Sequence, residues 1–339
     1  MLKLFDVLVV GSGPAACAVA ATCQNVGLKV LIVTEETGRK IDTVSPQPLE
    51  SIHPGVASLL EKIGAKGIEV NSAFGHYSGI QAGDTYTPLG EDSYGVWQGL
   101  HINRQLFNAH LLDRMIDLGV SVRFNVRVDD FLKEENRVVG IKTSGESYFA
   151  NFIVDASGTK SIAGKKLNFK RKFFSPPLLC WTGVSGYFET YPFDQQAAHF
   201  IPTKNGWTWL ASYHPNMCSW TRLTIKGEKS LWPPDELRAY STIGKIHFAN
   251  MRWRLFRPVC SEGILLCGDA AGILDPAAGQ GIFNALLSGI VAANTIVSCF
   301  QQPEIEAFHL ANYDDWFVSQ FEEKVRQLRS YYDEHGIRW

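Results

Sequence analysis

The first residues of the chain have the spacing of a phosphate-binding turn. An apolar run at residues 6–10 leads directly into Gly11-Ser12-Gly13-Pro14-Ala15-Ala16, which has the pattern G-x-G-x-x-A. Gly11 permits a tight turn, Gly13 lets the backbone approach a pyrophosphate, and Ala16 allows the next helix to pack closely. That helix should run from Pro14 to about residue 26 and offer its N–H groups to phosphates. The sequence therefore predicts a dinucleotide site.

The acid that usually holds the adenosine ribose is missing from its expected position. Gly27 should end the first helix, and residues 29–33 have the pattern of the second parallel strand of a βαβ unit. Thr34 occupies the position where the acid is expected, and Glu35 follows it. Glu35 either reaches the ribose hydroxyls or is a solvated loop charge, and the sequence leaves both interpretations open.

A second motif far along the chain completes the first. Residues 263–267 have the pattern of a buried strand that delivers Asp269 to a turn, and the next helix should begin near Gly281. Asp269 can accept hydrogen bonds from ribityl hydroxyls, and the helix would point its positive end toward the flavin pyrimidine. Together the two motifs predict bound FAD. The cofactor-binding candidates are Gly11, Gly13, Pro14, Ala15, Ala16 and Glu35, then Gly268, Asp269, Pro276, Gly279, Gln280, Gly281 and Ile282.

A third motif lies between these two. It is an apolar strand that ends in a polar turn, Phe152-Ile153-Val154-Asp155-Ala156-Ser157-Gly158. With the three motifs in this order, nearly the whole chain resembles the two-domain FAD-dependent monooxygenases, flavin-dependent halogenases and geranylgeranyl reductases of the glutathione-reductase-type FAD fold. The resemblance implies an α/β fold in which a Rossmann-like FAD-binding domain is interleaved with an antiparallel-sheet substrate domain and followed by a C-terminal helix.

The expected domains are discontinuous in sequence. The aromatic and β-branched runs from residue 173 to 227 are typical of antiparallel strands, which in the family form a wall over the reactive face of the flavin. The boundaries that we predict are 1–50, 96–160 and 250–300 for the FAD-binding domain, 51–95 and 161–249 for the substrate domain, and 301–339 for the C-terminal helical segment.

Other segments resemble particular branches of this superfamily. Arg104 matches the arginine that opens a helix beside the ribityl and phosphate chain of the flavin, although a surface arginine would look the same in sequence. Residues 50–55 resemble the halogenase-like flavoproteins that modify tryptophan during quinone-cofactor maturation. Residues 205–209 are similar to the halogenase signature W-x-W-x-I-P, but Ala211-Ser212 replaces the Ile-Pro pair, which argues against halogenation.

Three residues are candidates for the catalytic site. His53 lies beside Pro54 in a loop that should approach the flavin, where a neutral imidazole could handle a proton or position a substrate. Trp207 and Trp209 lie on one face of an expected strand and could line a pocket for a flat ring. In the simpler alternative, His53 only caps the following helix and both tryptophans belong to the core.

The leading hypothesis is an FAD-dependent monooxygenase with flavin hydroperoxide chemistry. The resemblance implies an aromatic substrate, with a tryptophan-like ring or a peptidyl tryptophan as the candidate. A flavin-dependent halogenase, a geranylgeranyl-reductase-like enzyme and a flavin-binding protein without its own chemistry remain alternatives. The halogenase branch uses a lysine near the pocket, and this region offers Lys62 and Lys66, which are more simply solvated helix charges.

The electrons should come from outside the chain. We find no second G-x-G-x-x-G in the sequence, so the reductant is either NAD(P)H that docks transiently or a partner flavin reductase.

Composition argues against several other classes of protein. A length of 339 residues suits two packed subdomains, and a net charge of -2 without a long basic run argues against nucleic acid as a partner. The 7 cysteines show no C-x-x-C spacing, which suits reduced thiols in the cytoplasm and predicts no metal site. No segment has the roughly 18 uncharged apolar residues of a transmembrane span. The chain ends at Trp339, where related proteins often continue.

Overall fold

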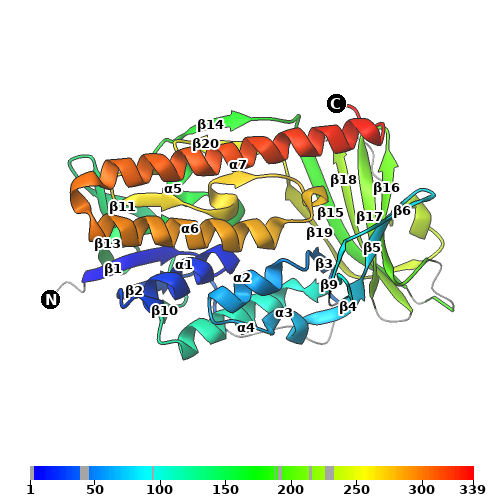
Figure 1. Ribbon diagram of the computed structural model, residues 1–339, viewed down its shortest axis with the longest axis horizontal. Coiled ribbons are helices and arrows are strands. Elements are labelled where there is room, and N and C mark those ends of the chain that lie inside the picture. Colours follow the sequence, from blue (N-terminus) through cyan, green and yellow to red (C-terminus); the bar gives the residue numbers. More distant parts are fainter. Residues whose placement is uncertain are drawn as a thin grey trace.

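Two large sheets lie at opposite ends of the molecule, and one long helix runs beside both. The computed structural model describes residues 4–38, 46–93, 95–186, 188–189, 193–213, 216–225 and 233–339. Helix α7 (Glu306–Glu334) extends from the first sheet to the second along one side of the molecule (Figure 1).

The first sheet is the Rossmann-like unit. Strands β2, β1, β13 and β22 are apolar, largely buried and parallel, because short strands that are buried on both faces favour this arrangement, and the more exposed β10 pairs parallel with β2 at the edge. The chain then adds an antiparallel extension, β12 and β11, at one edge and β21 beside β22. The strands in order are β10 (Ser121–Arg123), β2 (Val30–Val33), β1 (Leu4–Val10), β13 (Ser147–Asp155), β12 (Arg137–Thr143) and β11 (Val128–Glu134), with β22 (Ile264–Leu266) and β21 (Cys260–Ser261) joined through β13.

The second sheet is the antiparallel wall expected from residues 173–227. Its neighbours are antiparallel except for β16 and β5, which run parallel. The strands in order are β19 (Ser241–Asn250), β15 (Leu178–Gly186), β18 (Met217–Ile225), β17 (Gly206–Tyr213), β16 (Ala197–Thr203), β5 (Gly79–Ala82) and β6 (Thr85–Pro88).

Smaller elements connect the two sheets. Three short sheets are formed by β3 (Leu49–Ile52), β9 (Gly99–Asn103) and β4 (Ala73–Tyr77), by β14 (Lys170–Phe173), β20 (Arg254–Arg257) and β23 (Gly272–Ile273), and by β7 (Glu91–Asp92) and β8 (Gly95–Val96). The other α-helices are α1 (Pro14–Asn25), α2 (Val56–Lys62), α3 (Ile68–Asn71), α4 (Arg104–Asp117), α5 (Ile162–Lys166) and α6 (Gly281–Gln301).

The two helices that follow the predicted cofactor motifs pack against each other. Helix α1 is rich in alanine and almost wholly buried, and small side chains let it approach α6 closely. At Gly289 of α6, an added Cβ would lie 2.5 Å from the carbonyl oxygen of Ala15. This contact sets the distance between the two motifs that begin these helices.

Helix α6 is long and apolar enough to cross a membrane by length and composition alone. In the fold it lies between α1 and α7, and half of its most apolar window is buried inside the protein. Packing between two other helices explains why α6 is so apolar.

The predicted α/β fold with an antiparallel sheet and a C-terminal helix is confirmed. The C-terminal helical segment expected at residues 301–339 contains α7, and the helix expected near Gly281 is α6. The exact domain boundaries stay a prediction, although both segments assigned to the substrate domain contribute strands to the second sheet.

Replacing Gly289 with alanine should destabilise the protein. Alanine favours helices by about 1 kcal/mol over glycine, but the new methyl group would force α1 and α6 apart. We expect the free energy of unfolding to fall by about 1–3 kcal/mol, measured by urea denaturation. The exposed position Asn294 on α6 provides the control, Asn294→Ala. Equal stabilities of the two variants would contradict the close contact.

Candidate functional site

The three sequence motifs meet at one edge of the first sheet. Strands β1, β13 and β22 run parallel, so their carboxyl ends lie together. The turns that follow them carry Gly11, Gly158 and Asp269. Ligands of open parallel sheets bind at this edge, which is why motifs so distant in sequence can form one site.

A cavity of about 570 Å³ opens at this edge and reaches the second sheet. One side is formed by the turns of the cofactor motifs, and the other by aromatic side chains that we call the aromatic wall. The predicted residues that line the cavity are Gly13, Pro14, Ala15, His53, Arg104, Trp207, Trp209, Asp269, Pro276, Gly279, Gln280 and Gly281. The aromatic wall consists of Tyr77, Phe200, Trp207, Trp209 and Tyr331.

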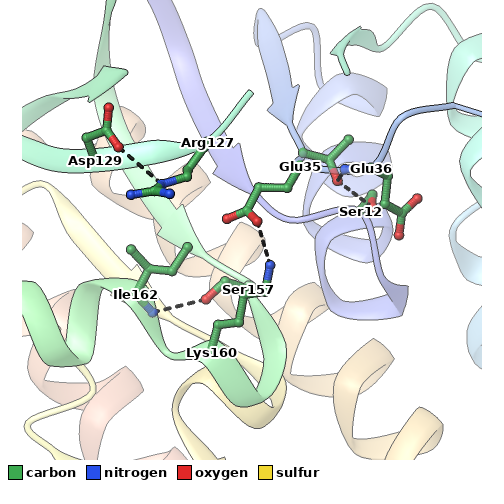
Figure 2. A network of polar contacts seen from close by, with 9 residues as sticks. Ser12, Glu35, Glu36, Arg127, Asp129, Ser157, Lys160 and Ile162 are labelled. Carbon is green, nitrogen blue, oxygen red and sulfur yellow. Dashed lines mark hydrogen bonds and ion pairs between the residues drawn. The ribbon is translucent and has the colours of Figure 1, made fainter. Parts of the chain in front are cut away.

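A second hollow, of about 230 Å³, continues from the first along the Rossmann-like sheet. The two share Gly13 and Gly158, and the second also contains Gly11 and Glu35. Glu35 accepts a hydrogen bond from Lys160 at 2.8 Å, as Figure 2 shows. Its place in the hollow is compatible with the ribose contact that the sequence left open, and that role stays a prediction.

Three predicted residues lie behind this surface. Ala16 and Ile282 are buried and support the helices that begin at the two motifs. Gly268 lines a small cavity of about 70 Å³ behind the loop from residue 268 to 281. Its φ of +57° explains why glycine stands there.

The cavity and the second hollow together form a trough, and the residues that line it fit FAD. The Asp269 carboxylate faces the cavity and forms no hydrogen bond with any residue that the structure describes. An added Cβ at Gly13 would point into open space, so this position leaves room that a side chain would fill. At Gly11, where φ is +112°, a Cβ would lie 2.4 Å from the Ala156 oxygen. Helices α1 and α6 both begin at the cavity without a side-chain cap, which leaves N–H groups for phosphate and flavin oxygens.

Burial governs the charge of Asp269. The surrounding protein raises its pKa to about 6, while Arg104 and Arg254 act in the opposite direction and Glu50 adds to the increase. A polar partner such as a ribityl hydroxyl would give this carboxylate the hydrogen bond that the protein does not provide.

Arg104 is held by an acid that the sequence did not single out for a role. Its Nη1 donates to Glu50 Oε2 at 2.5 Å and its Nε to Asn108 Oδ1 at 3.0 Å. Asn103 accepts hydrogen bonds from Gln105 N and Leu106 N, so it caps α4 and fixes the start of the helix. Arg104 and Glu50 both line the cavity.

A buried carboxylate joins the flavin-motif loop to the aromatic wall. Asp275 is 1% exposed, and its Oδ2 accepts a hydrogen bond from Trp253 Nε1 at 2.6 Å. Its Oδ1 accepts hydrogen bonds from Tyr332 Oη at 2.7 Å and from Ala277 N at 3.0 Å. Tyr332 Oη in turn accepts a hydrogen bond from Trp207 Nε1 at 2.7 Å. Burial raises the pKa of Asp275 to about 6, and these donors oppose the increase.

The second tryptophan of the wall is fixed by another chain of hydrogen bonds. Trp209 Nε1 donates to Ser51 Oγ at 2.9 Å, and Ser51 Oγ lies 2.9 Å from His101 Nδ1. Burial lowers the pKa of His101 to about 3, so it stays neutral, and its ring stacks on Tyr77 at 4.7 Å.

His53 lines the cavity, but one of its nitrogens already has a structural contact. Its Nδ1 accepts a hydrogen bond from Gly55 N at 3.0 Å, close to the start of α2. Partial burial lowers the pKa of His53, which favours the neutral ring. A catalytic role would therefore use Nε2 of His53. That role stays a prediction.

Sequence reasoning missed several residues of the site. Asp275 had a detectable signal, because it is an acid inside an apolar segment between two cofactor-motif glycines. No local pattern marked Tyr332 or Trp253, which reach Asp275 from distant parts of the chain. Ser51 belongs to the segment quoted for its resemblance, but its hydrogen bonds were not foreseen.

The described lining of this cavity contains neither a metal-binding cluster nor a lysine. Within the described ranges, no group of three His, Cys, Asp or Glu side chains could hold a metal. The seven cysteines are unbridged and buried. Lys62 and Lys66 are exposed, and none of the described residues that line the cavity is a lysine.

Family profiles and known proteins are similar to this chain over most of its length. The profile of the tryptophan halogenase family matches residues 85–335, and that of an FAD binding domain matches residues 6–47. A digeranylgeranylglycerophospholipid reductase of Methanopyrus kandleri is 26% identical, over 96% of this chain and 89% of the relative. A 1H-pyrrole-2-carbonyl-(peptidyl-carrier protein) chlorinase of Pseudomonas fluorescens is 24% identical, over 91% of this chain and 79% of the relative.

One solved structure extends the comparison of folds. The peptidyl tryptophan dihydroxylase QhpG, described as essential for tryptophylquinone cofactor biogenesis, superposes with a TM-score of 0.70. It is 20% identical, and the alignment covers 98% of this chain and 74% of QhpG. This likeness shows a shared fold.

Asp269→Asn should stabilise the apoprotein and weaken FAD binding. A raised carboxyl pKa means that the folded chain binds the proton more tightly than the unfolded chain, so stability falls as pH rises from about 4 to about 6. Asparagine removes this loss, and we expect a gain of about 1–3 kcal/mol at neutral pH that vanishes near pH 4. The FAD dissociation constant should rise about tenfold or more.

Thermal unfolding of the apoprotein across this pH range and titration of flavin fluorescence measure the two effects. Parallel stability profiles of variant and wild type would contradict the raised pKa. Unchanged FAD affinity would contradict the contact with the cofactor.

Tyr332→Phe should destabilise the protein by about 1–3 kcal/mol. The change removes the acceptor of Trp207 and one of the donors to Asp275, and it leaves both groups buried. Tyr331→Phe is the matched control, because the Tyr331 hydroxyl forms no hydrogen bond with the described residues. Urea denaturation of both variants checks this prediction, and an equal loss in the two would show that the hydroxyl bridge contributes nothing.

Proposed function

This chain belongs to the tryptophan halogenase family of FAD-dependent oxidoreductases, and on that premise we propose that it is a monooxygenase of an aromatic, tryptophan-like substrate. The observation that carries the proposal is the aromatic wall opposite the glycine-rich cofactor turns in one cavity. A flat ring between these two sides would stack on aromatic faces and lie next to the flavin.

The wall is rigid enough to orient such a ring. Trp207 and Trp209 are each fixed at Nε1 by a hydrogen bond, and Phe200 packs between Trp207 and Tyr331 at centroid distances of 5.9 and 5.1 Å. Positioned aromatic surfaces hold a substrate in one orientation and exclude water. The dihydroxylase QhpG, whose name gives peptidyl tryptophan as its substrate, supports a tryptophan side chain as the ring.

The reaction balances as a hydroxylation. One atom of O₂ is inserted into a ring C–H bond and gives a hydroxyl group. The other atom is reduced to water by two electrons from the reductant, with the uptake of two protons. Bound FAD would supply the two electrons and activate the oxygen. The chain would hold the ring against the aromatic wall, and His53, which lines the same cavity, would exchange a proton with the substrate through Nε2.

Two alternatives use the same cofactor. The chlorinase relative and the family profile support halogenation, but the cavity lining described above lacks the lysine that the halogenase branch uses. The phospholipid reductase relative and the apolar side chains Ile80, Leu89 and Met251 in the cavity favour an alkene reductase. We rank the monooxygenase first because of the two tryptophans in the wall.

Isotope-labelled oxygen separates these reactions. The FAD-loaded protein would be supplied with NADPH or with a flavin reductase, in labelled O₂ with chloride and bromide, and offered a tryptophan amide, a tryptophan peptide and a geranylgeranyl lipid. We expect mass spectrometry to find one labelled oxygen atom in the indole ring of the amide or the peptide. Halogen in the product, or two added hydrogens in the lipid without O₂ consumption, would overturn the monooxygenase in favour of that alternative.

A further inference from the structure

A separate hollow lies beside the C-terminal end of α7, outside the main cavity. Its volume is about 550 Å³, within the usual range of roughly 300–1,000 Å³ for small-molecule sites. Its walls come from the segment after β14, from the segment before β20, and from the last turns of α7 with the residues that follow. Three arginines line it, Arg252, Arg329 and Arg338, and we call it the arginine groove.

Within the described part of the chain, the arginines of this groove have no acidic partners. None of the three forms an ion pair with a carboxylate of the described chain, although Asp333 also lines the groove. Arg329 Nη2 donates to Phe174 O at 2.8 Å, and Arg252 Nε donates to Ser175 O at 3.2 Å. These neutral carbonyls hold the side chains in place and leave most of their N–H donors for a ligand.

Stacking on an aromatic ring also holds the guanidinium groups in place. The Arg252 guanidinium lies 3.7 Å from the ring centroid of Phe173, and Arg171 of β14 lies 4.8 Å from the same ring. The chain as a whole carries a net charge of -2, so this concentration of cations is local. Several guanidinium groups around one hollow suit a dianionic phosphate better than a single carboxylate, because each can bind phosphate oxygens in a bidentate manner.

We propose that the arginine groove binds the phosphate group of an organic phosphate ester. The Trp339 ring in the groove would contact the organic part of the same molecule. Two sources share this chemistry, a phosphorylated nucleotide such as NADPH and a phosphopantetheine arm.

The groove is one side chain away from the main cavity. Tyr332 lines the groove, and its hydroxyl bonds Asp275 and Trp207, which line the cavity. Trp339 contacts Tyr332 at a centroid distance of 4.8 Å and Trp253 at 5.8 Å. A ligand in the groove therefore touches residues that hold the aromatic wall, and it should change the tryptophan fluorescence.

Calorimetric titration of the FAD-loaded full chain tests the site without turnover. The probes are NADP⁺ against NAD⁺, phosphopantetheine against pantetheine, and inorganic phosphate. We expect one phosphorylated compound to bind about tenfold or more tightly than its partner without that phosphate. The pair that shows this preference identifies the source of the phosphate.

Variants locate the binding in the groove. Arg329→Gln and Arg338→Gln should each reduce the preference for the phosphorylated compound about tenfold. Arg338 is exposed, and its side chain forms no hydrogen bond or ion pair with the described residues, so this change should not disturb folding. Arg326→Gln removes the same charge from α7 outside the groove, where Arg326 pairs with Glu323, and should have no effect.

The absence of a phosphate preference in both pairs would overturn the proposal, as would a preference that survives both groove variants or is lost equally in Arg326→Gln. Because binding is measured directly, these outcomes do not depend on whether the protein is a monooxygenase.

Discussion

The buried carboxylate of Asp275 joins the parts of this protein that must act together. It belongs to the loop that carries the second cofactor motif, it bonds Trp253 beside β20, and through Tyr332 of α7 it reaches Trp207 in the second sheet. A buried charge is costly unless hydrogen-bond donors surround it. Removing one donor therefore leaves the Asp275 carboxylate less well compensated and destabilises the whole network. The position of the aromatic wall relative to the cofactor turns depends on this network.

The cavity is built from two kinds of surface with different tasks. Glycines and uncapped helix ends form the cofactor side, because only bare backbone allows a pyrophosphate and a flat ring to approach closely. Locked aromatic rings form the other side. Without cofactor, this arrangement leaves Asp269 in an unfavourable environment. Its carboxylate lies in the cavity wall with a raised pKa and without a hydrogen bond to the described residues. The FAD that completes the site would also stabilise the fold.

Sequence could predict what depends on local pattern. The G-x-G-x-x-A turn and the Gly268–Ile282 motif identified the cofactor edge, because glycine spacing reports backbone geometry directly. The alternation of Trp207 and Trp209 placed both on one face of a strand, but only the three-dimensional structure shows that both side chains border the cavity. The Glu50–Arg104 pair and the bond from Tyr332 to Asp275 join residues far apart in sequence, and no local signal connects them.

We expect FAD to lie along the trough from Glu35 to the aromatic wall. A crystal structure of the chain grown with FAD tests it most directly. We predict electron density for the adenosine in the hollow beside Glu35, for the pyrophosphate at Gly13, and for the flavin ring between the Asp269 turn and Trp209, with a ribityl hydroxyl within hydrogen-bond distance of Asp269. FAD bound elsewhere, or a flavin ring that lies away from the aromatic wall, would contradict this arrangement of the cofactor.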